Sequence, residues 1–439
     1  MNMRKTGAFC SLWLLAAVAS AQVPPMISVP PAGKCYTDPV TGNRVCRVTD
    51  RSICANGGEH NYSYWPAWNQ SGTHLVVVCK RWTAARDGGT LHLLLVRDSD
   101  LAILGSGAML GAPALNPLTV FWAWTDPNLI YAQGSGHNVG QLWQWNPFAR
   151  KAKKIKDFYG LRVLDRKVAD MFLAYVSFDD RYFLLQFKSG GRDFALAVYD
   201  KQADALVGVL DLSQFRAYDE AVFTKDNHVW VVADAGAKLE SFRYSLDFTE
   251  RVRVAEHGHH AHGLLPDGTP VAVKEEPNRG CAADSPSGVP NNPWKPSGMV
   301  LDERVDTTGT PRPLGPLKSQ LLQLGCNIPG QHHYQHYSWN NKQRDGFFVS
   351  SLGYSGFETD PTAFGILRVR LKFDAAGKII GDEIDLLAHH RSNPKGPYLA
   401  YPRATCNQQG TRCLFSSTMT VQTDNTDHQP HLYVVDFKP

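Results

Sequence analysis

The chain has 439 residues, with 45 Lys and Arg against 41 Asp and Glu, so its formal net charge is only +4. A charge this close to balance argues against a dedicated nucleic-acid-binding protein, which would need a strongly basic surface. Aromatic residues make up 11% of the chain and include 11 Trp. That content suits β-sheet packing and also stacking on sugar rings.

Residues 1–21 predict a secretory signal peptide. Arg4 and Lys5 form a short positive region, and an apolar run over residues 8–18 follows it. The run ends in Ala19-Ser20-Ala21, a cleavage site of the small-x-small type. It is too short to span a bilayer. We therefore expect a secreted or periplasmic protein without a stable membrane anchor, in which residues 22–439 form a single domain.

Cysteine usage agrees with export. The chain has nine Cys, of which Cys10 leaves with the signal peptide, so an even number remains. An even number in an exported protein favours disulfides over metal thiolates. Sequence alone leaves the connectivity open, and short spacings favour the following four pairs: Cys35–Cys46, Cys54–Cys79, Cys281–Cys326 and Cys406–Cys413.

One pattern recurs seven times along the chain: an apolar strand, a polar turn with Asp, Asn or Gly, and a second apolar strand. The seven hairpins are expected at residues 64–78, 121–132, 173–186, 220–232, 261–273, 335–350 and 402–416. Their spacing brackets the length of a four-stranded blade. The pattern predicts an all-β fold, a seven-bladed β-propeller of four-stranded antiparallel blades. A β-sandwich or two smaller β domains are the alternatives.

Two further features complete the predicted ring. The last strand, at residues 431–437, is expected to pair with an N-terminal strand near residues 44–48, which would leave no open sheet edge. Residues near 275–297 are rich in Pro, Gly and Asn. We expect them to form an inserted loop between the second and third strands of the fifth repeat.

The polar residues of the last three repeats stand out. The first strand of each propeller blade lines the central channel, and its side chains alternate. In the fifth, sixth and seventh repeats the channel-facing positions are polar, whereas in the first three they are mainly apolar. The polar positions are His260, His262, Tyr334, His336, Tyr401 and Arg403. Asp219 and Glu220 could add a carboxylate from the fourth repeat.

Further histidines precede these strands and are expected at the same end of the channel. They are His257, His259, His332, His333, His389 and His390. Each could equally be a hydrogen-bonded core residue or a solvated loop residue. Several neutral imidazoles that converge on one opening would form a site for a divalent metal ion (Mn, Ca or Zn). The expected ligands are His262 and His336, with His260, Gln331 and His333 as additional donors.

Such a set suits the removal of a proton next to a uronate carboxylate. A metal ion or an Arg must first neutralise the carboxylate, after which a neutral His or Tyr can take the proton. We expect the catalytic residues to be His260, Tyr334, Tyr401 and Arg403.

Two segments carry a resemblance to a known group. The repeats resemble those of TolB-type propellers. The segments HGHHAHG (257–263) and GQHHYQHYSW (330–339) resemble the metal-site blades of propeller polysaccharide lyases, above all oligogalacturonate lyases. The resemblance implies that Gln and His residues hold a divalent metal, while a separate His and Arg perform the elimination. Carried over, the ligands would be His262, Gln331, His333 and His336.

The resemblance has limits. The resemblance in the repeat pattern covers most of the chain, but the resemblance in the two His-rich segments covers only two blades. The fourth repeat shows Tyr218-Asp219-Glu220 where the family is expected to carry its catalytic His. The catalytic Arg has no clear match beyond Arg192 or Arg216.

We expect a monomer whose partner is an anionic polysaccharide or oligosaccharide, and no nucleic acid. Two other classes remain open: a non-catalytic propeller that binds a glycan or a protein, and a metal-dependent hydrolase.

Overall fold

The computed structural model describes residues 24–85, 91–234, 239–256, 259–276, 298–302, 321–324, 332–353, 364–377, 379–393 and 401–438. The described residues form β-strands and three single-turn 3-10 helices: η1 (Ala108–Leu110), η2 (Gly136–Asn138) and η3 (Leu212–Gln214). Within these ranges, no helix has the length and hydropathy needed to cross a membrane.

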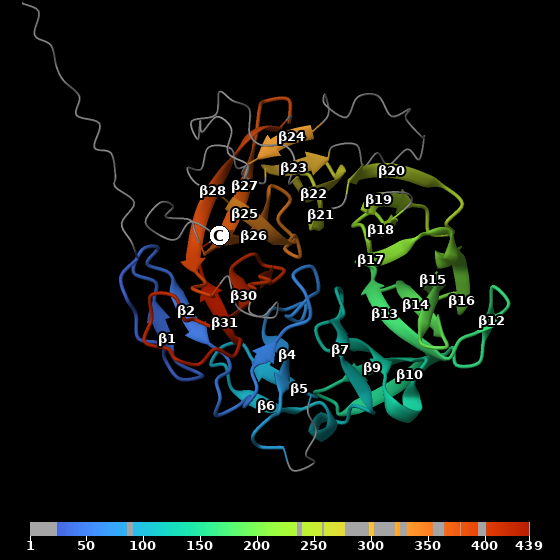
Figure 1. Cartoon of the computed structure of the whole chain (residues 1–439), viewed down its shortest axis with the longest axis horizontal. Coiled ribbons are helices and arrows are strands. Elements are labelled where there is room, and N and C mark those ends of the chain that lie inside the picture. Colours follow the sequence, from blue (N-terminus) through green and yellow to red (C-terminus); the bar gives the residue numbers. More distant parts are fainter. Residues whose placement is uncertain are drawn as a thin grey trace, which may run out of the picture.

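Six four-stranded antiparallel sheets follow one another around a ring, each built from consecutive strands (Figure 1). We call them blades 1 to 6. Blade 1 contains β3 (Gly58–Glu59), β4 (His74–Lys80), β5 (Leu91–Arg97) and β6 (Ile103–Ser106). Blade 2 contains β7 (Leu115–Trp122), β8 (Ile130–Gly134), β9 (Gln141–Asn146) and β10 (Lys151–Asp157). Blade 3 contains β13 (Asp170–Val176), β14 (Tyr182–Ser189), β15 (Arg192–Asp200) and β16 (Ala205–Asp211).

The other three blades repeat the arrangement, so that the first strand of each lies nearest the axis (Figure 1). Blade 4 contains β17 (Ala217–Phe223), β18 (Val229–Asp234), β19 (Leu239–Tyr244) and β20 (Arg251–Glu256). Blade 5 contains β21 (His260–Leu264), β22 (Pro270–Glu276), β23 (Gly298–Asp302) and β24 (Leu321–Leu324). Blade 6 contains β25 (His332–Ser338), β26 (Gly346–Gly353), β27 (Gly365–Phe373) and β28 (Ile379–His389). A small ribbon of β11 (Arg162–Val163) and β12 (Arg166–Lys167) lies in the connection between blades 2 and 3.

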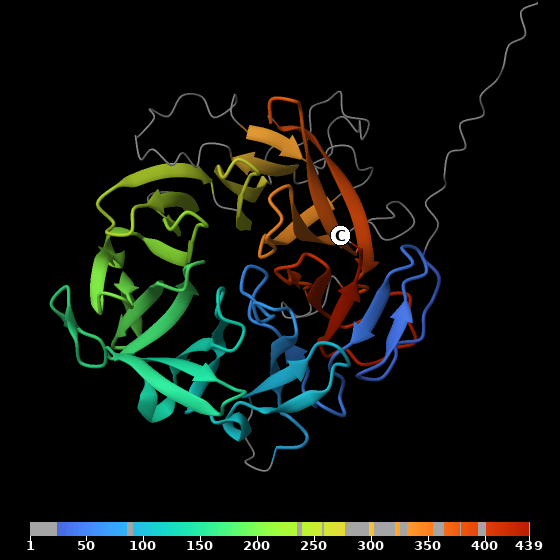
Figure 2. The ribbon, with the colours of Figure 1, turned by 180° about the vertical axis from the view of Figure 1, so that it is seen from behind.

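Both ends of the chain meet in one further sheet, which we call the closing sheet. Its strand order is β1 (Cys35–Thr37), β2 (Arg44–Arg47), β31 (His431–Asp436), β30 (Arg412–Ser417) and β29 (Thr405–Cys406). The strands β2 and β31 pair antiparallel, with Arg44 opposite Asp436 and Arg47 opposite Tyr433. The predicted pairing of the last strand with the segment near residues 44–48 is confirmed. Figure 2 shows the same meeting of blue and red strands from behind.

The closing sheet corrects the predicted architecture. Seven four-stranded blades were expected, but the described residues form six, and the closing sheet has five strands. The physical reason is the β1–β2 hairpin, in which Cys35 lies opposite Cys46 and is bonded to it. Because the hairpin joins the sheet as one unit, β2 brings β1 with it as an extra outer strand.

The first inner strand also differs from its prediction. It was expected at residues 64–68, yet the innermost strand of blade 1 is β3, and Trp68 keeps only an isolated bridge to Leu75. Pro66 has no amide hydrogen and cannot donate to a ladder, which explains the interruption. In the same way, β29 is only two residues long and begins after Pro402. Two neighbouring inner strands are thus cut short on one side of the channel.

Three of the four predicted disulfides are present: Cys35–Cys46, Cys54–Cys79 and Cys406–Cys413. The fourth predicted pair, Cys281–Cys326, lies outside the described residues. Three such pairs in one domain are typical of proteins that fold in an oxidising compartment.

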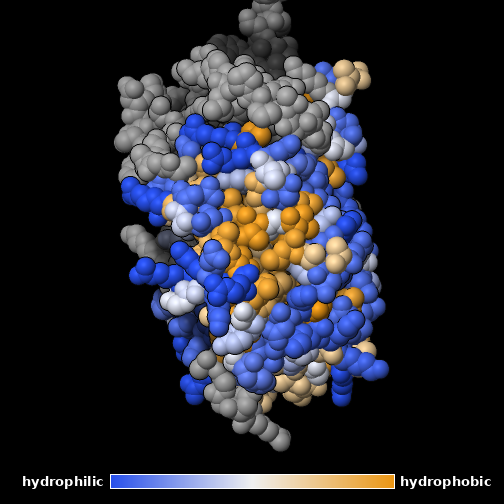
Figure 3. Space-filling view, turned by 90° about the vertical axis from the view of Figure 1, so that its right-hand side faces the viewer, coloured by the Kyte–Doolittle hydropathy of each residue, from blue (hydrophilic) through white to orange (hydrophobic). Residues whose placement is uncertain are grey.

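Apolar side chains fill the spaces between neighbouring sheets. Blade 1 packs on blade 2 through a cluster that contains Val76, Trp122 and Trp145, and blade 5 packs on blade 6 through Trp339. Gly263 makes the second contact possible, because a Cβ atom there would lie 2.2 Å from the Trp339 ring. Seen from the side, apolar side chains gather on the outer wall of the ring between polar ones (Figure 3).

The predicted insertion falls on residues that follow the second strand of blade 5 in the sequence. The strands β22 and β23 are neighbours in blade 5, so residues 277–297 connect its second and third strands. These residues themselves lie outside the described ranges.

Candidate functional site

A pocket of about 390 Å³ lies at the end of the channel where the chain enters the innermost strands of the blades. We call it the entry pocket. Its lining residues come from blades 1 to 4 and from the segment before β29. They are Glu59, His60, Asn61, Tyr62, Tyr64, Trp65, Leu118, Phe172, Ala174, Gln186, Tyr218, Asp219, Glu220, Ala221 and Arg403. Its volume falls in the range of small-molecule binding sites.

Arg403 provides a buried cation at this pocket. Its side chain is 6% exposed, and Nη2 lies 3.6 Å from Oε2 of Glu59. The same carboxylate oxygen lies 3.5 Å from Nζ of Lys80. One carboxylate therefore faces two cations. The Arg403 guanidinium also lies 5.8 Å from the centre of the Tyr62 ring. A planar guanidinium in this setting is suited to a carboxylate ligand.

Glu220 joins two side chains on the other side of the pocket. Its Oε1 lies 3.1 Å from Nε2 of His260, and its Oε2 accepts a hydrogen bond from the Tyr64 hydroxyl. The rings of Tyr64 and His260 are parallel, with centres 5.8 Å apart. Burial alone would raise the pKa of Glu220, but the hydrogen bond and charge of His260, together with Tyr64, outweigh it and lower the pKa to about 2.

The same contacts fix the state of Tyr64. Burial first, and then the negative charge of Glu220, raise the pKa of the Tyr64 hydroxyl well above its ordinary value. At neutral pH Glu220 is therefore ionised and Tyr64 is a protonated donor. The chain from Tyr64 through Glu220 to His260 holds all three side chains in place.

Three buried histidines are neutral at physiological pH. Burial, with the charge of Arg403, lowers the pKa of His60 to about 3. Burial likewise lowers the pKa values of His262 and His336 well below the ordinary value. Because a neutral imidazole keeps one nitrogen with a free electron pair, such side chains can accept a proton or bind a metal ion.

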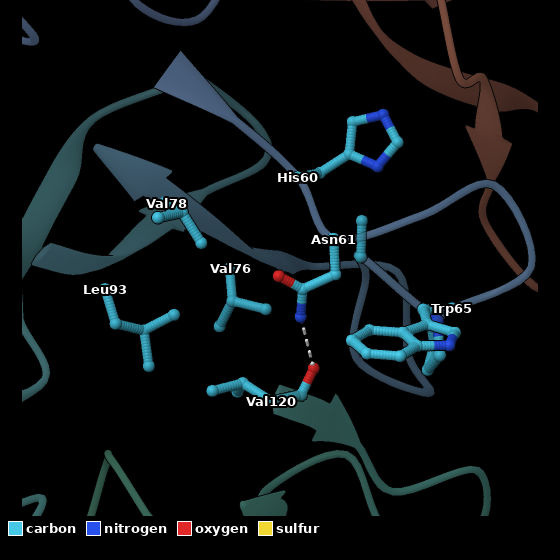
Figure 4. Close-up of a pocket in the computed structure, with 9 residues that line it drawn as sticks. His60, Asn61, Trp65, Val76, Val78, Leu93 and Val120 are labelled. Atoms are coloured by element: carbon cyan, nitrogen blue, oxygen red, sulfur yellow. Dashed lines mark hydrogen bonds between the residues drawn. The ribbon is translucent and has the colours of Figure 1, made fainter. Parts of the chain in front are cut away.

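The imidazole of His60 is directed away from the core of blade 1. Figure 4 shows it pointing away from Val76, Val78 and Leu93, whereas the amide of the next residue, Asn61, donates a hydrogen bond of 3.1 Å to the Val120 carbonyl. The cavity among these residues has a volume of only about 10 Å³, room for one water molecule. His60 therefore has a packed wall behind it and the larger entry pocket on its other side.

His336 has an unusual backbone conformation. Its φ angle is 60°, and the register of β25 against β26 shifts between Gln335 and Tyr337. A bulge of this kind changes the direction of a side chain and is frequent next to active sites. The His336 ring lies 4.7 Å from the His259 ring and 5.3 Å from the Tyr62 ring, measured between centres.

The predicted site residues fall into two groups in space. Arg403 lines the entry pocket, while His260 and His336 contact its lining residues Glu220 and Tyr62. His262 lies apart from this opening, beside Trp230 and His260, with ring centres 4.8 and 5.0 Å away.

For the remaining predicted residues, the structure gives fewer contacts or does not describe the side chain. Tyr401 is half-buried before β29, and its carbonyl accepts a hydrogen bond of 3.0 Å from Ser416. Tyr334 and His333 lie on β25, but their side chains fall outside the described set, as does the whole of Gln331. Among the side chains that are described, no group of three or more His, Cys, Asp or Glu is arranged to hold a metal ion. The metal ligands therefore stay a prediction.

Two of the predicted mouth histidines have structural roles instead. His389 ends β28, the outermost strand of blade 6. Its backbone N–H donates a hydrogen bond of 3.0 Å to Asp38, and its Nδ1 lies 3.4 Å from the same oxygen. The backbone N–H of His390 donates a 2.6 Å bond to the Phe364 carbonyl. Both histidines are fully buried, and they lie at and just after the end of an outermost strand, not before an innermost one. His257 lies outside the described residues.

Several lining residues of the entry pocket were absent from the sequence prediction, among them Glu59, His60 and Tyr62. These three precede the expected first strand, in a polar and aromatic run, GGEHNYSYW, that directly precedes an apolar repeat. Tyr62 matters for the geometry because its ring lies 4.7 Å from that of Tyr64 and so connects the two halves of the site.

The fold and the pocket together define an all-β propeller with a polar site at one end of its channel. No family model matches the chain, and no curated protein matches it in sequence. Solved structures do match in fold. A structure described as oligogalacturonate lyase in complex with manganese has a TM-score of 0.56 and 14% identity, over 94% of this chain and 98% of that one.

A second structure, oligogalacturonate lyase from Vibrio parahaemolyticus, gives a TM-score of 0.55 and 12% identity, over 94% of this chain and 98% of that one. TolB from Acinetobacter baumannii, at a TM-score of 0.35 and 10% identity over 83% of this chain and 81% of that one, is too distant to support an argument. At such identities the first two likenesses establish the β-propeller fold alone.

Proposed function

We propose that the protein is an exported carbohydrate-active propeller, a lyase-like enzyme that cleaves a uronate-containing glycan by metal-assisted β-elimination. One observation carries the proposal: the entry pocket places the buried Arg403 guanidinium beside a neutral imidazole, His60, in a space of about 390 Å³. The fold shared with oligogalacturonate lyases and the three disulfides support the class of enzyme and its export.

In this proposal Arg403 binds the uronate carboxylate. Glu59 is shared between Arg403 and Lys80, so around Arg403 the two cations exceed their one carboxylate by one charge, whereas Asp219 and Glu220 belong to the blade 4 side of the pocket. The negative charge of a substrate carboxylate neutralises this excess positive charge. Its neutralisation lowers the energy of the negative charge that develops when the neighbouring carbon loses its proton.

His60 is the proposed proton acceptor. It takes the proton from the carbon next to the carboxylate, a carbon–carbon double bond forms, and the bond to the glycosidic oxygen breaks. The protonated imidazole then gives the same proton to the leaving oxygen, so that the enzyme returns to its starting state. Binding of a carboxylate at Arg403 also offsets the positive charge that depresses the pKa of His60, which improves His60 as a base.

His260 and Glu220 are positioning residues in this scheme, because Glu220 holds the Tyr64 hydroxyl and His260 holds Glu220. The rings of Tyr62 and Tyr64 offer faces on which a sugar can stack. The predicted catalytic roles of Tyr334 and Tyr401 are not needed for this cycle.

A divalent metal ion would fit beside this pocket. His259 and His336 lie with ring centres 4.7 Å apart, His336 is held neutral by burial, and imidazoles are good donors for Mn and Zn. His333 and Gln331 are the predicted additional donors on or before the same strand. When bound, the ion would share with Arg403 the neutralisation of the substrate carboxylate.

The test is a product assay with the purified mature protein. Polygalacturonate, ulvan and a glycosaminoglycan are each incubated with Mn, Ca, Zn or a chelator, and the ultraviolet absorbance of an unsaturated uronate is followed. We expect absorbance with one glycan class, its loss with the chelator, and its strong reduction in His60→Gln. Glycan binding without any product would leave a binding propeller, and new reducing ends without absorbance would indicate a hydrolase. Either outcome overturns the lyase proposal.

A further inference from the structure

The opposite end of the channel contains a second pocket, of about 500 Å³. We call it the turn pocket, because most of its lining residues lie in the turns between the first two strands of the blades and of the closing sheet, while blade 5 contributes the last residue of β21, Leu264. Its lining residues are Gln70, Trp124, Thr125, Phe178, Lys225, Leu264, Asn340, Asn341, Lys342, Gln343, Arg344 and Gln408.

A layer of hydrogen bonds lies between the two pockets. The Thr405 hydroxyl donates to the Trp65 carbonyl at 2.9 Å and accepts from the Asn340 amide at 2.9 Å. Trp65 lines the entry pocket, whereas Asn340 lines the turn pocket, and the two linings share no residue. The turn pocket is therefore a site of its own.

The charge of the turn pocket is one-sided. Among its lining residues are three cations, Lys225, Lys342 and Arg344, and no carboxylate. Lys225 is the innermost of them: its Nζ donates a 3.2 Å bond to the Asn341 carbonyl and lies 5.4 Å from the centre of the Phe178 ring. Burial, with the charge of Arg344, lowers the pKa of Lys225 to about 7. An anion bound here would stabilise the charged forms of both side chains.

The rest of the lining suits a sugar. The rings of Trp124 and Phe178 form a tilted pair with centres 4.4 Å apart. Around them stand side-chain amides, which can pair with sugar hydroxyls. These amides belong to Gln70, Asn340, Asn341, Gln343 and Gln408. The amide nitrogens of Asn340, Asn341 and Gln408 already donate within the protein, so these three offer their oxygens as acceptors. Aromatic faces with a few convergent polar groups are typical of ligand sites.

We propose that the turn pocket is a second binding site, which holds an anionic saccharide through Lys225 and Arg344 and stacks it on Trp124 and Phe178. The ligand class agrees with the proposed function, but the argument rests on the lining of this pocket and does not require the entry pocket to be catalytic. A glycan-degrading propeller with such a site could retain an acidic chain or product on its second face.

The experiment uses the full mature protein with Arg403→Gln, which disables carboxylate binding in the entry pocket. Binding of digalacturonate is measured by isothermal titration calorimetry, with a neutral galactose disaccharide and inorganic phosphate as the comparison ligands. We expect digalacturonate to bind, and Lys225→Met or Arg344→Gln, added singly, to weaken it at least about tenfold, because each removes a charge-assisted contact. Lys153→Met, a matched change at an exposed position on β10, should leave the affinity unchanged.

Three results would overturn the proposal. These are no digalacturonate binding in the Arg403→Gln protein, binding that neither Lys225→Met nor Arg344→Gln weakens, and equally tight binding of the neutral disaccharide or of phosphate. Arg344 is exposed, so its variant tests the site even if Lys225→Met does not fold. Binding here without any lyase product would disprove only the proposed function, and product without this binding would disprove only the second site.

Discussion

The two ends of the channel are built from the same sheets but differ in how their charges are matched. In the entry pocket carboxylates lie beside cationic or basic groups, as Glu59 lies beside Arg403 and Glu220 beside His260. In the turn pocket Lys225 and its neighbouring cations face amides and aromatic rings. Matched charges with neutral imidazoles suit proton transfer, while unmatched cations suit retention of an anion. The propeller thus separates two kinds of recognition along one axis.

The largest expected effect is at Arg403. Arg403→Gln should lower kcat/KM on the uronate substrate by about 100- to 1,000-fold, as the loss of one strong electrostatic contact in a transition state does. Steady-state kinetics on the glycan identified above measures it. The control is Arg162→Gln, at an exposed position on β11. An equal loss of kcat/KM in Arg162→Gln would show that the effect of Arg403→Gln is not specific to the entry pocket.

The next prediction tests whether the entry pocket and the turn pocket depend on the same packing contact. Gly263→Ala should destabilise the fold by about 1–3 kcal/mol, because the new methyl group would overlap the buried Trp339 ring. Gly263 lies in β21, which also carries His260 beside Glu220 of the entry pocket and Leu264 of the turn pocket, so turnover and digalacturonate binding should fall together. Thermal unfolding gives the stability. Gly107→Ala is the control, since its nearest neighbour would lie at 3.5 Å; a similar loss there would contradict the account.

A smaller effect is expected at the bulge of the entry pocket. His336 has a φ of 60°, which Asn adopts readily and a β-branched residue does not. His336→Val should therefore be about 1–2 kcal/mol less stable than His336→Asn, and both should lose metal-dependent activity. Chemical denaturation compares the two variants. Equal stability would show that the backbone of β25 relaxes and that the bulge does not depend on the residue.

The smallest effect concerns pH. The folded-state pKa of Glu220 is about 2, below its ordinary value of about 4.5, so its contribution to stability is present above pH 4.5 and is lost as the pH falls toward 2. The unfolding temperature of Glu220→Gln should therefore fall less between pH 4.5 and 2 than that of the unchanged protein. Glu250→Gln, at an exposed turn, is the control. Parallel curves for Glu220→Gln and the unchanged protein would mean that Glu220 is not paired as described.

Much of the fold was predictable because hairpins repeat a local pattern. The strands β4, β14 and β30 fall close to their expected positions, and the pairing of β2 with β31 was anticipated. The fifth strand of the closing sheet was not predicted, because β1 is only three residues long, lacks the apolar repeat pattern, and joins the sheet solely through its local hairpin with β2. The loss of the expected strand at residues 64–68 has a cause that the sequence shows, because Pro66 has no amide hydrogen. The alignment of the repeats placed a strand there in spite of it.

The site was harder to predict because alternation fails at bulges. Register shifts occur in β7, β13, β17 and β25, and each reverses the facing of the residues beyond it. Trp122, aligned with channel-facing positions, is therefore buried between blades 1 and 2. His60 and Tyr62 were missed because they precede the aligned strand. The sequence pattern did not predict the turn pocket, since turn residues follow no periodicity that would show which of them lie together.

The joining of the two chain ends in one sheet has a consequence for the order in which the molecule is made. A chain that emerges N-terminus first presents β2 before any of its partners on the C-terminal side exists, and Arg44 meets Asp436 only when nearly the whole chain has been released. The last blade can therefore be completed only after synthesis, or after passage through a membrane, has almost finished. Until then β2, in the disulfide-linked β1–β2 hairpin, has no partner strand on its other edge. In a chain that ends before β31, that edge stays unpaired permanently.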